Sequence, residues 1–244
     1  MSLDEFSTSS NSSANYDAVA TQLPQVEPGI VLWWCPLERT VLQLEHASAL
    51  LSPAEQTRAA RFGTAALRAR YIAGRSMLRL LLGRALGVEP ATVPIVRGRR
   101  GRPQLDTASD IDFNVSHTQE VALIGIARGA RIGIDVERID RNVNADGLCR
   151  KFLTSAERAT CEPVGADLRR QRFLHYWTCK EALSKATGDG LSAPFRQLEI
   201  ELNDVIRLVA GPAPYAPAHW RLRAAEVPIG FFGTVAIWSG RSMS

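Results

Sequence analysis

The chain has 244 residues, of which 45% are apolar and 22% charged, a composition typical of a globular protein with one large or two small domains. Its four cysteines are scattered without a Cys-x-x-Cys pair and its four histidines show no metal-ligand spacing, which argues against a disulfide framework and a zinc site. No apolar run approaches the roughly 20 residues that span a bilayer, and the acidic, Ser-rich start is unlike a secretory signal, so we expect a cytoplasmic protein with no membrane partner.

The charge is distributed unevenly. Residues 1–57 contain seven acids and one base, whereas residues 58–102 contain eleven arginines and one acid. Such a basic block meets phosphates or an acidic partner, so a nucleotide cofactor, an acidic protein and a nucleic acid all remain open. Only three of the 29 basic residues are lysines, and Lys180 and Lys185 lie in one predicted helix. Because an ammonium differs chemically from a planar guanidinium, these two positions indicate a need for a compact charge.

The first half of the chain predicts strands around a helical region. Residues 1–28 are polar and are expected to be a disordered tail. A capping box that begins at Ser52 predicts a helix start, and helical sequence continues to Leu86 with a break near Gly63 or Gly74. Strands are predicted at 30–34, 92–96, 111–115, 121–127 and 131–137.

The second half repeats this order. One helix is predicted from Ser155 and a longer one over 169–187, and strands are predicted at 198–202, 205–209, 220–223 and 231–238. Helices followed by strands, twice, predict an α+β protein of two similar lobes with the active site in the cleft between them. We place the lobes at 29–140 and 141–244.

The segment R-I-G-I-D-V-E predicts two neighbouring acids on one strand face. In an extended chain Asp135 and Glu137 point the same way, opposite to the isoleucines and Val136. Such close carboxylates repel each other, and a divalent cation relieves that repulsion. An exposed edge strand with an acidic face explains the pattern equally well.

The segment W-T-C-K-E-A-L-S-K-A-T-G-D-G lies on the longer helix. Glu181 and Lys185 are spaced for a surface salt bridge, but Lys180 falls on the apolar stripe, where it must either extend out to solvent or face a buried anion. Upstream, Ser116 and His117 follow a strand in N-V-S-H. Adjacent strand residues point in opposite directions, so a nucleophile–base pair is not expected, and the binding of phosphate oxygens fits better.

Taken together, N-V-S-H, R-I-G-I-D-V-E, F-L-T-S-A-E and W-T-C-K-E-A-L-S-K-A-T-G-D-G-L resemble the signature of the surfactin-type 4'-phosphopantetheinyl transferases. Their order and spacing match over about residues 50–195. The resemblance implies a two-lobed pseudo-dimer, sufficient as a monomer, with coenzyme A and Mg²⁺ between the lobes. It also implies the reaction: a serine of an apo acyl or peptidyl carrier protein attacks the β-phosphate of coenzyme A and 3',5'-ADP leaves.

The resemblance also implies roles for single residues. It casts Asp135, Glu137 and Glu181 as metal ligands, with Glu181 a candidate catalytic base. Lys185 and Lys180 would neutralise the pyrophosphate as its charge develops.

Further cofactor contacts are implied by the same resemblance. Ser116 and His117 would bind the phosphates, and the turn at Arg102 and Pro103 would lie near the adenine. The 3'-phosphate would be bound from one long helix, by one of Arg70, Arg75 and Arg79. Glu157 fits a capping box with Thr154 better than it fits a site.

Two other functions would use the same features. A nucleic-acid-binding module would account for the arginines at 58–102, but it predicts more interleaved aromatic residues than this segment has. A magnesium-dependent hydrolase of pyrophosphates could use the same carboxylates and would need no carrier protein.

Overall fold

The computed structural model describes residues 20–98 and 100–239. The N-terminal elements are β1 (Thr21–Gln22), β2 (Ile30–Pro36), α2 (Val41–Ala49), α3 (Pro53–Ala60), α4 (Ala65–Leu86), η1 (Pro90–Thr92), β3 (Ile95–Arg97), β4 (Pro103–Leu105), β5 (Ile111–His117) and β6 (Val121–Arg128). The C-terminal elements are β7 (Arg131–Arg138), α5 (Ala145–Phe152), α6 (Ser155–Cys161), α7 (Ala166–Thr187), η2 (Gly190–Ser192), η3 (Phe195–Gln197), β8 (Glu199–Leu202), β9 (Ile206–Ala210), η4 (Pro217–His219), β10 (Trp220–Ala224) and β11 (Phe231–Trp238).

The two halves repeat one order of elements. In each, a strand leads into two short helices, a 22-residue helix and then two hairpins. The strand orders β1-β2-β6-β5 and β10-β11-β7 correspond when β2 is matched with β7, β6 with β11, and β5 with β10. The expected α+β fold with two similar lobes is therefore confirmed.

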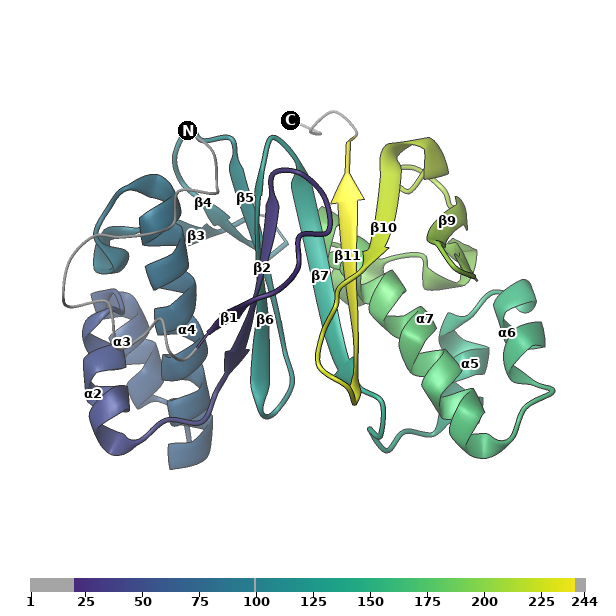
Figure 1. The fold of residues 1–244 in the computed structure, drawn as a ribbon, viewed down its shortest axis with the longest axis horizontal. Helices are drawn as coiled ribbons and strands as arrows, with labels where there is room; N and C mark the ends of the chain where they lie inside the picture. The colour runs from purple at the N-terminus through teal and green to yellow at the C-terminus, as the bar shows by residue number, and fades with distance from the viewer. Residues whose placement is uncertain (1–19, 99, 240–244) are drawn as a thin grey trace.

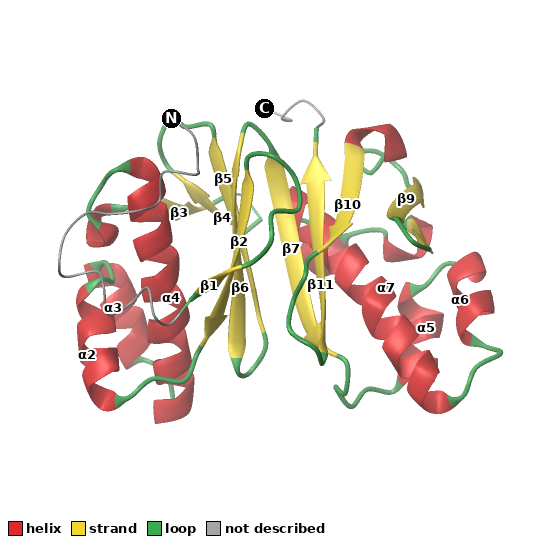
Figure 2. Cartoon of the chain, viewed as in Figure 1, coloured by secondary structure: helices red, strands yellow, loops and turns green. Residues whose placement is uncertain are grey.

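The lobes meet through their sheets. Helices α2–α4 cover one side of the molecule and α5–α7 the other, and the two larger sheets lie between them (Figures 1 and 2). The apolar cluster between the sheets includes Leu32 and Leu123 of the first sheet and Ile132, Ile134 and Val136 of β7. The opposite face of β7 therefore turns toward α7.

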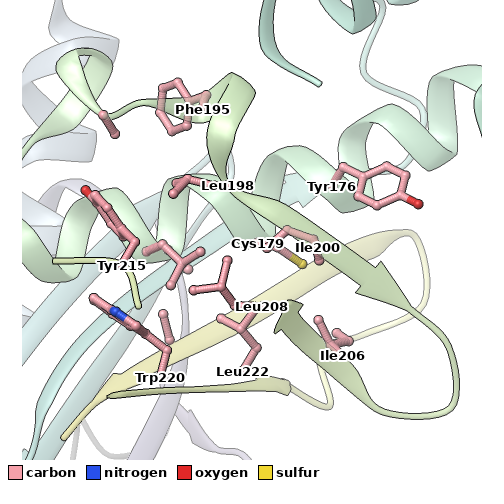
Figure 3. Packing of buried hydrophobic residues seen from close by; sticks show 14 of the residues in the cluster. Tyr176, Cys179, Phe195, Leu198, Ile200, Ile206, Leu208, Tyr215, Trp220 and Leu222 are labelled. Atoms are coloured by element: carbon pink, nitrogen blue, oxygen red, sulfur yellow. The ribbon is translucent and has the colours of Figure 1, made fainter. Parts of the chain in front are cut away.

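The C-terminal lobe has its own core between α7 and the strands that follow. Figure 3 shows Cys179 of α7 together with Leu198, Leu208 and Trp220, all of them buried. All four cysteines are buried free thiols. Within the described residues, no helix is both long and apolar enough to cross a membrane.

Local sequence signals explain where the helices begin and end. Ser52 and Thr154 cap α3 and α6 through complete capping boxes, and α4 and α7 each end at a glycine with positive φ, Gly87 and Gly188. The predicted helix break occurs around Gly63, between α3 and α4.

Two of the predicted boundaries, that of the tail and that between the lobes, lie close to strands β1 and β7. Residues 1–19 of the expected tail lie outside the described residues, whereas residues 20–28 include β1, which pairs with β2. The division at residue 140 stays a proposal, although β7 pairs with β11 and so belongs by hydrogen bonding to the C-terminal strands.

Candidate active site

A cluster of polar groups lies where β5, β7 and α7 meet. The Lys185 ammonium lies 2.6 Å from Asp135 Oδ1 and 2.8 Å from Ser116 Oγ. Ser116 in turn donates to Asp135 Oδ1 at 2.8 Å. Asp135 is 5% exposed and Ser116 4%, so three of the predicted residues, from three elements, converge at one buried point.

A glycine on β7 makes this convergence possible. A Cβ at Gly133 would lie 2.0 Å from the main-chain oxygen of Ala182 and 2.4 Å from the nitrogen of Ala186. Only a residue without a side chain lets the α7 backbone come this close to the strand. The face of β7 that carries Asp135 is thereby pressed against the side of α7 that carries Lys185.

The carboxylates of this site influence one another. The pKa of Glu181 is raised from 4.5 to about 7 by burial and then by the charge of Asp135, which Lys185 partly offsets. Burial, followed by Asp135, also raises the pKa of Glu137, opposed by its ion-pair partner Arg141. Negative charge is thus concentrated here beyond what the nearby bases neutralise.

Two buried carboxylate oxygens in the site lack a partner. Asp135 Oδ2 and Glu181 Oε1 have no hydrogen bond within the described chain. Buried carboxylate oxygens are normally satisfied by donors or cations. Oxygen donors of this kind fit a hard divalent cation such as Mg²⁺.

The acids are nevertheless not gathered as a complete metal cage. Among the described residues, no group of three or more His, Cys, Asp and Glu side chains is close enough to hold an ion. A full cage is not required, because Mg²⁺ commonly takes one or two carboxylates and completes its shell with substrate phosphates and water. The three-ligand set predicted from the sequence remains a proposal.

Comparisons with known proteins identify the family. A model described as "4'-phosphopantetheinyl transferase, N-terminal" matches residues 33–127, and the 4'-phosphopantetheinyl transferase superfamily model matches residues 131–232. The 4'-phosphopantetheinyl transferase HetI of Nostoc sp. is 37% identical over 187 residues, which cover 75% of this chain and 78% of the relative. The chain belongs to the 4'-phosphopantetheinyl transferase superfamily.

Other relatives agree with this assignment. A phosphopantetheinyl transferase of Thraustochytrium sp. is 30% identical over 189 residues, 71% of this chain and 64% of the relative. The 4'-phosphopantetheinyl transferase of Bacillus subtilis is 26% identical over 135 residues, 55% of this chain and 59% of the relative. The two family models meet between β6 and β7, where the structural repeat begins again.

Lys180 of this transferase does not join the Asp135 cluster. Its side chain is fully buried, forms a 2.7 Å ion pair with Glu157 and donates to the main-chain oxygens of Phe195 and Leu198, each at 2.6 Å. All three ammonium hydrogens therefore have acceptors inside the C-terminal lobe. The predicted contact of Lys180 with the pyrophosphate is corrected to an internal role.

Glu157 is the anion that Lys180 faces. One of its oxygens accepts from Thr154 N at 2.8 Å and the other from Ile200 N at 2.8 Å. Burial raises the pKa of Glu157, and the charge of Lys180 opposes that rise. The prediction that Glu157 is a helix cap is confirmed.

The three candidate arginines of α4 differ in whether their guanidinium groups already have partners within the protein. Arg79 is 2% exposed, pairs with Glu55 and donates to the main-chain oxygens of Pro90 and Ala91 at 2.7 and 3.0 Å. Arg75 also pairs with Glu55. Arg70 is half-buried and makes no ion pair or hydrogen bond within the described residues, so the structure leaves Arg70 as the candidate for a ligand phosphate.

Arg102 serves as an internal link. Its guanidinium binds Asp112 at 3.0 and 2.7 Å and donates to the main-chain oxygens of Lys185 and Ile132 at 2.9 and 2.8 Å. The predicted adenine contact of the turn at Arg102 and Pro103 stays a proposal, although this guanidinium already has partners within the protein. Pro103 begins β4, and His117 lies exposed at the end of β5, one residue beyond Ser116.

Two polar residues of β5, half-buried Asp112 and buried Asn114, were missed from the sequence. Asp112 and Asn114 accept main-chain N–H groups of β7, as Ser116 does. The alternation of polar residues in D-F-N-V-S was the available signal, because it puts three polar side chains on one strand face.

Two cavities lie elsewhere on the molecule. One of about 450 Å³ is lined by Arg102, Arg131 and Trp238 among others. A second of about 570 Å³ is lined by Gly188 and Gly190, which follow α7, and by Tyr215 among others.

Proposed function

We propose that this protein is a surfactin-type member of the superfamily that transfers 4'-phosphopantetheine from coenzyme A to a serine of an apo acyl or peptidyl carrier protein. The observation that carries the proposal is the meeting of Ser116, Asp135 and Lys185, with Glu181 coupled electrostatically to Asp135. Acids and a lysine on two facing elements suit the transfer of a phosphoryl group between bound partners.

Glu181 is assigned as the base that accepts the proton of the carrier serine. A general base works best with a pKa near the working pH. Without a bound cation the pKa of Glu181 is raised to about 7 by burial and by Asp135, and a cation bound to this carboxylate would lower it. As the hydroxyl oxygen forms its bond to the β-phosphorus, its proton passes to the Glu181 carboxylate. The bond from that phosphorus to the oxygen of the 3',5'-ADP group breaks.

The unpartnered oxygens of Asp135 and Glu181, with Glu137 beside them, are the groups that would hold Mg²⁺. When bound, the ion neutralises charge on the diphosphate. Lys185 adds a compact positive charge on a flexible stem, and His117, exposed at the end of β5, is assigned to the same phosphates. The contact of Ser116 with the phosphates that the sequence predicts would require its hydroxyl proton to leave Asp135 Oδ1. Arg70 is assigned to the 3'-phosphate because its guanidinium makes no ion pair or hydrogen bond within the described chain.

The two alternative functions are less well supported. Four arginines of the basic block, Arg75, Arg79, Arg100 and Arg102, make ion pairs within the described part of the protein, which leaves fewer of them for a nucleic acid. A hydrolase would share the carboxylates but would use water as acceptor. A monomeric form and a cytoplasmic location remain predictions from the sequence.

One experiment separates these functions. The protein is mixed with coenzyme A, Mg²⁺ and an apo carrier protein, and the carrier is weighed by mass spectrometry while 3',5'-ADP is measured by chromatography. We expect the carrier to gain one phosphopantetheine for each 3',5'-ADP released. Release of 3',5'-ADP at the same rate without a carrier would instead indicate the hydrolase.

A further inference from the structure

The edge of β7 that faces β5 is closed by side chains. β7 pairs with β11 on one edge, and no described strand pairs with the other. Main-chain N–H groups along a buried edge need acceptors. Ile132 N donates to Asp112 Oδ2 at 2.8 Å, Ile134 N to Asn114 Oδ1 at 3.0 Å, and Val136 N to Ser116 Oγ at 3.2 Å.

These three bonds set the register of β7 against β5. Each acceptor lies 20 residues before its donor, and the acceptors are alternate residues on one strand, so a slip of one residue would separate all three acceptors from these amides. A slip of one residue would turn the Asp135 face toward the apolar cluster between the sheets. Register across this seam therefore determines whether Asp135 meets Ser116 and Lys185.

Asn114 is the central member of the series and is 6% exposed. Its neighbours have additional partners: Asp112 binds Arg102, and Ser116 binds Asp135. The carboxamide oxygen of Asn114 accepts from a main-chain amide of β7 and belongs to no site role assigned above. Its contribution can thus be tested without altering a group that would touch the substrate.

We propose that Asn114 is a positioning residue for the transfer reaction, because its bond to Ile134 N holds β7 where Asp135 lies between Ser116 and Lys185. This inference rests on the proposed function, with the magnesium and phosphate groups as assigned there.

The test compares Asn114→Leu, which keeps the size but loses the acceptor, with Asn114→Ser. A serine at the next position of the same face, Ser116, accepts a β7 amide through its hydroxyl, so Asn114→Ser is the conservative variant. Ile126→Val, in β6 and away from the seam, serves as a control for a small loss of core packing.

Hydrogen exchange at Ile134 gives the direct readout. We expect Asn114→Leu to speed exchange of this amide about tenfold or more, with little change at the amides of β6. Asn114→Ser is expected to recover most of the protection. Unchanged exchange at Ile134 in Asn114→Leu would overturn the proposal.

Kinetics separate positioning from a merely structural role. In Asn114→Leu we expect kcat to fall about 10- to 100-fold, with a smaller change in KM for coenzyme A and a higher Mg²⁺ midpoint, and Asn114→Ser to recover most of kcat. If Ile126→Val loses as much kcat at equal folded fraction, or if Asn114→Leu keeps the parent kcat and Mg²⁺ midpoint, the role is overturned.

Calorimetry of coenzyme A binding in the presence of Mg²⁺ distinguishes this inference from the proposed function. If the parent protein binds coenzyme A but transfers nothing, only the proposed transfer reaction fails. The positioning role of Asn114 is then supported if Asn114→Leu weakens coenzyme A binding and Asn114→Ser restores it, and is overturned if Asn114→Leu binds as the parent does. Should the parent neither bind nor transfer, both fail.

Discussion

Replacement of Glu181 by glutamine is expected to make the metal-free protein more stable at neutral and alkaline pH. In the folded protein burial and the charge of Asp135 raise the pKa of Glu181 from 4.5 to about 7. The folded state therefore holds this proton more tightly than the unfolded state, and stability falls as pH rises from about 4.5 to about 7. At about 1.4 kcal/mol for each pKa unit, and allowing for screening of a partly exposed carboxylate, the loss is about 2 to 3 kcal/mol.

The measurement is urea unfolding followed by tryptophan fluorescence in the presence of a chelator, at about pH 5 and about pH 8. Glu181→Gln should exceed the parent by less than about 1 kcal/mol at the lower pH and by about 2 to 3 kcal/mol at the higher. Glu45→Gln, an exposed change on α2, should alter neither value much. A Glu181→Gln difference that is equal at both pH values would refute the raised pKa. Added Mg²⁺ should reduce the difference in unfolding free energy between Glu181→Gln and the parent at the higher pH, because an ion that binds only the folded parent stabilises it by mass action.

Four other changes test the site and its supports. Asp135→Asn should lower kcat at least about 100-fold while circular dichroism shows an unchanged fold. Lys185→Arg should also lower kcat, about tenfold or more, because a planar fork cannot replace a compact ammonium; parental turnover in the carrier-mass assay would contradict this. Lys180→Met leaves Glu157 buried without its partner and should cost about 3 to 5 kcal/mol in urea unfolding, with part of that loss recovered when Glu157→Gln is added. Arg70→Ala should raise KM for coenzyme A but not for its 3'-dephospho form, and an equal rise for both would remove Arg70 from the 3'-phosphate.

Local signals made much of the fold predictable. The capping boxes at Ser52 and Thr154 fixed two helix starts, and the alternation in R-I-G-I-D-V-E identified the faces of β7. Short elements were missed: α2, α5 and β4 each extend over nine residues or fewer, and α2 was missed although a capping box at Thr40 marks its start. Their formation depends on packing that sequence periodicity does not reveal.

The buried bases show why the predicted site was ambiguous. Lys180 on an apolar stripe required a buried anion, but the sequence could not say whether that anion was a ligand or the cap residue Glu157. Arg102 was likewise predicted at a functional turn, and its partner Asp112 lies ten residues away on the next long strand. A buried cation has the same sequence pattern whether its partner is a substrate or the protein itself.

The internal repeat shows why these bases are structural. Arg79 and Lys180 both stand at the fifteenth position of a 22-residue helix, each bound to the acidic residue that caps the short helix before it. Each also donates to the main chain of a 3-10 segment after its long helix, Arg79 to Pro90 of η1 and Lys180 to Phe195 of η3. The ion pair between a buried base and a capping acid occurs in both lobes, although only one lobe has the reactive carboxylates. We therefore infer that this ion pair holds the helices together and does not bind the substrate.

Equivalent positions of the two lobes also show which polar groups occur in only one of them. Judged by strand pairing, Trp33 and Cys35 of β2 occupy the places of the two acids on β7, and Leu80 of α4 occupies the place of Glu181. The N-terminal half thus packs apolar side chains where the C-terminal half has carboxylates. Because Ser116 reaches those carboxylates from the N-terminal sheet, neither half has all the groups of the proposed site, and the chemistry requires the seam between them.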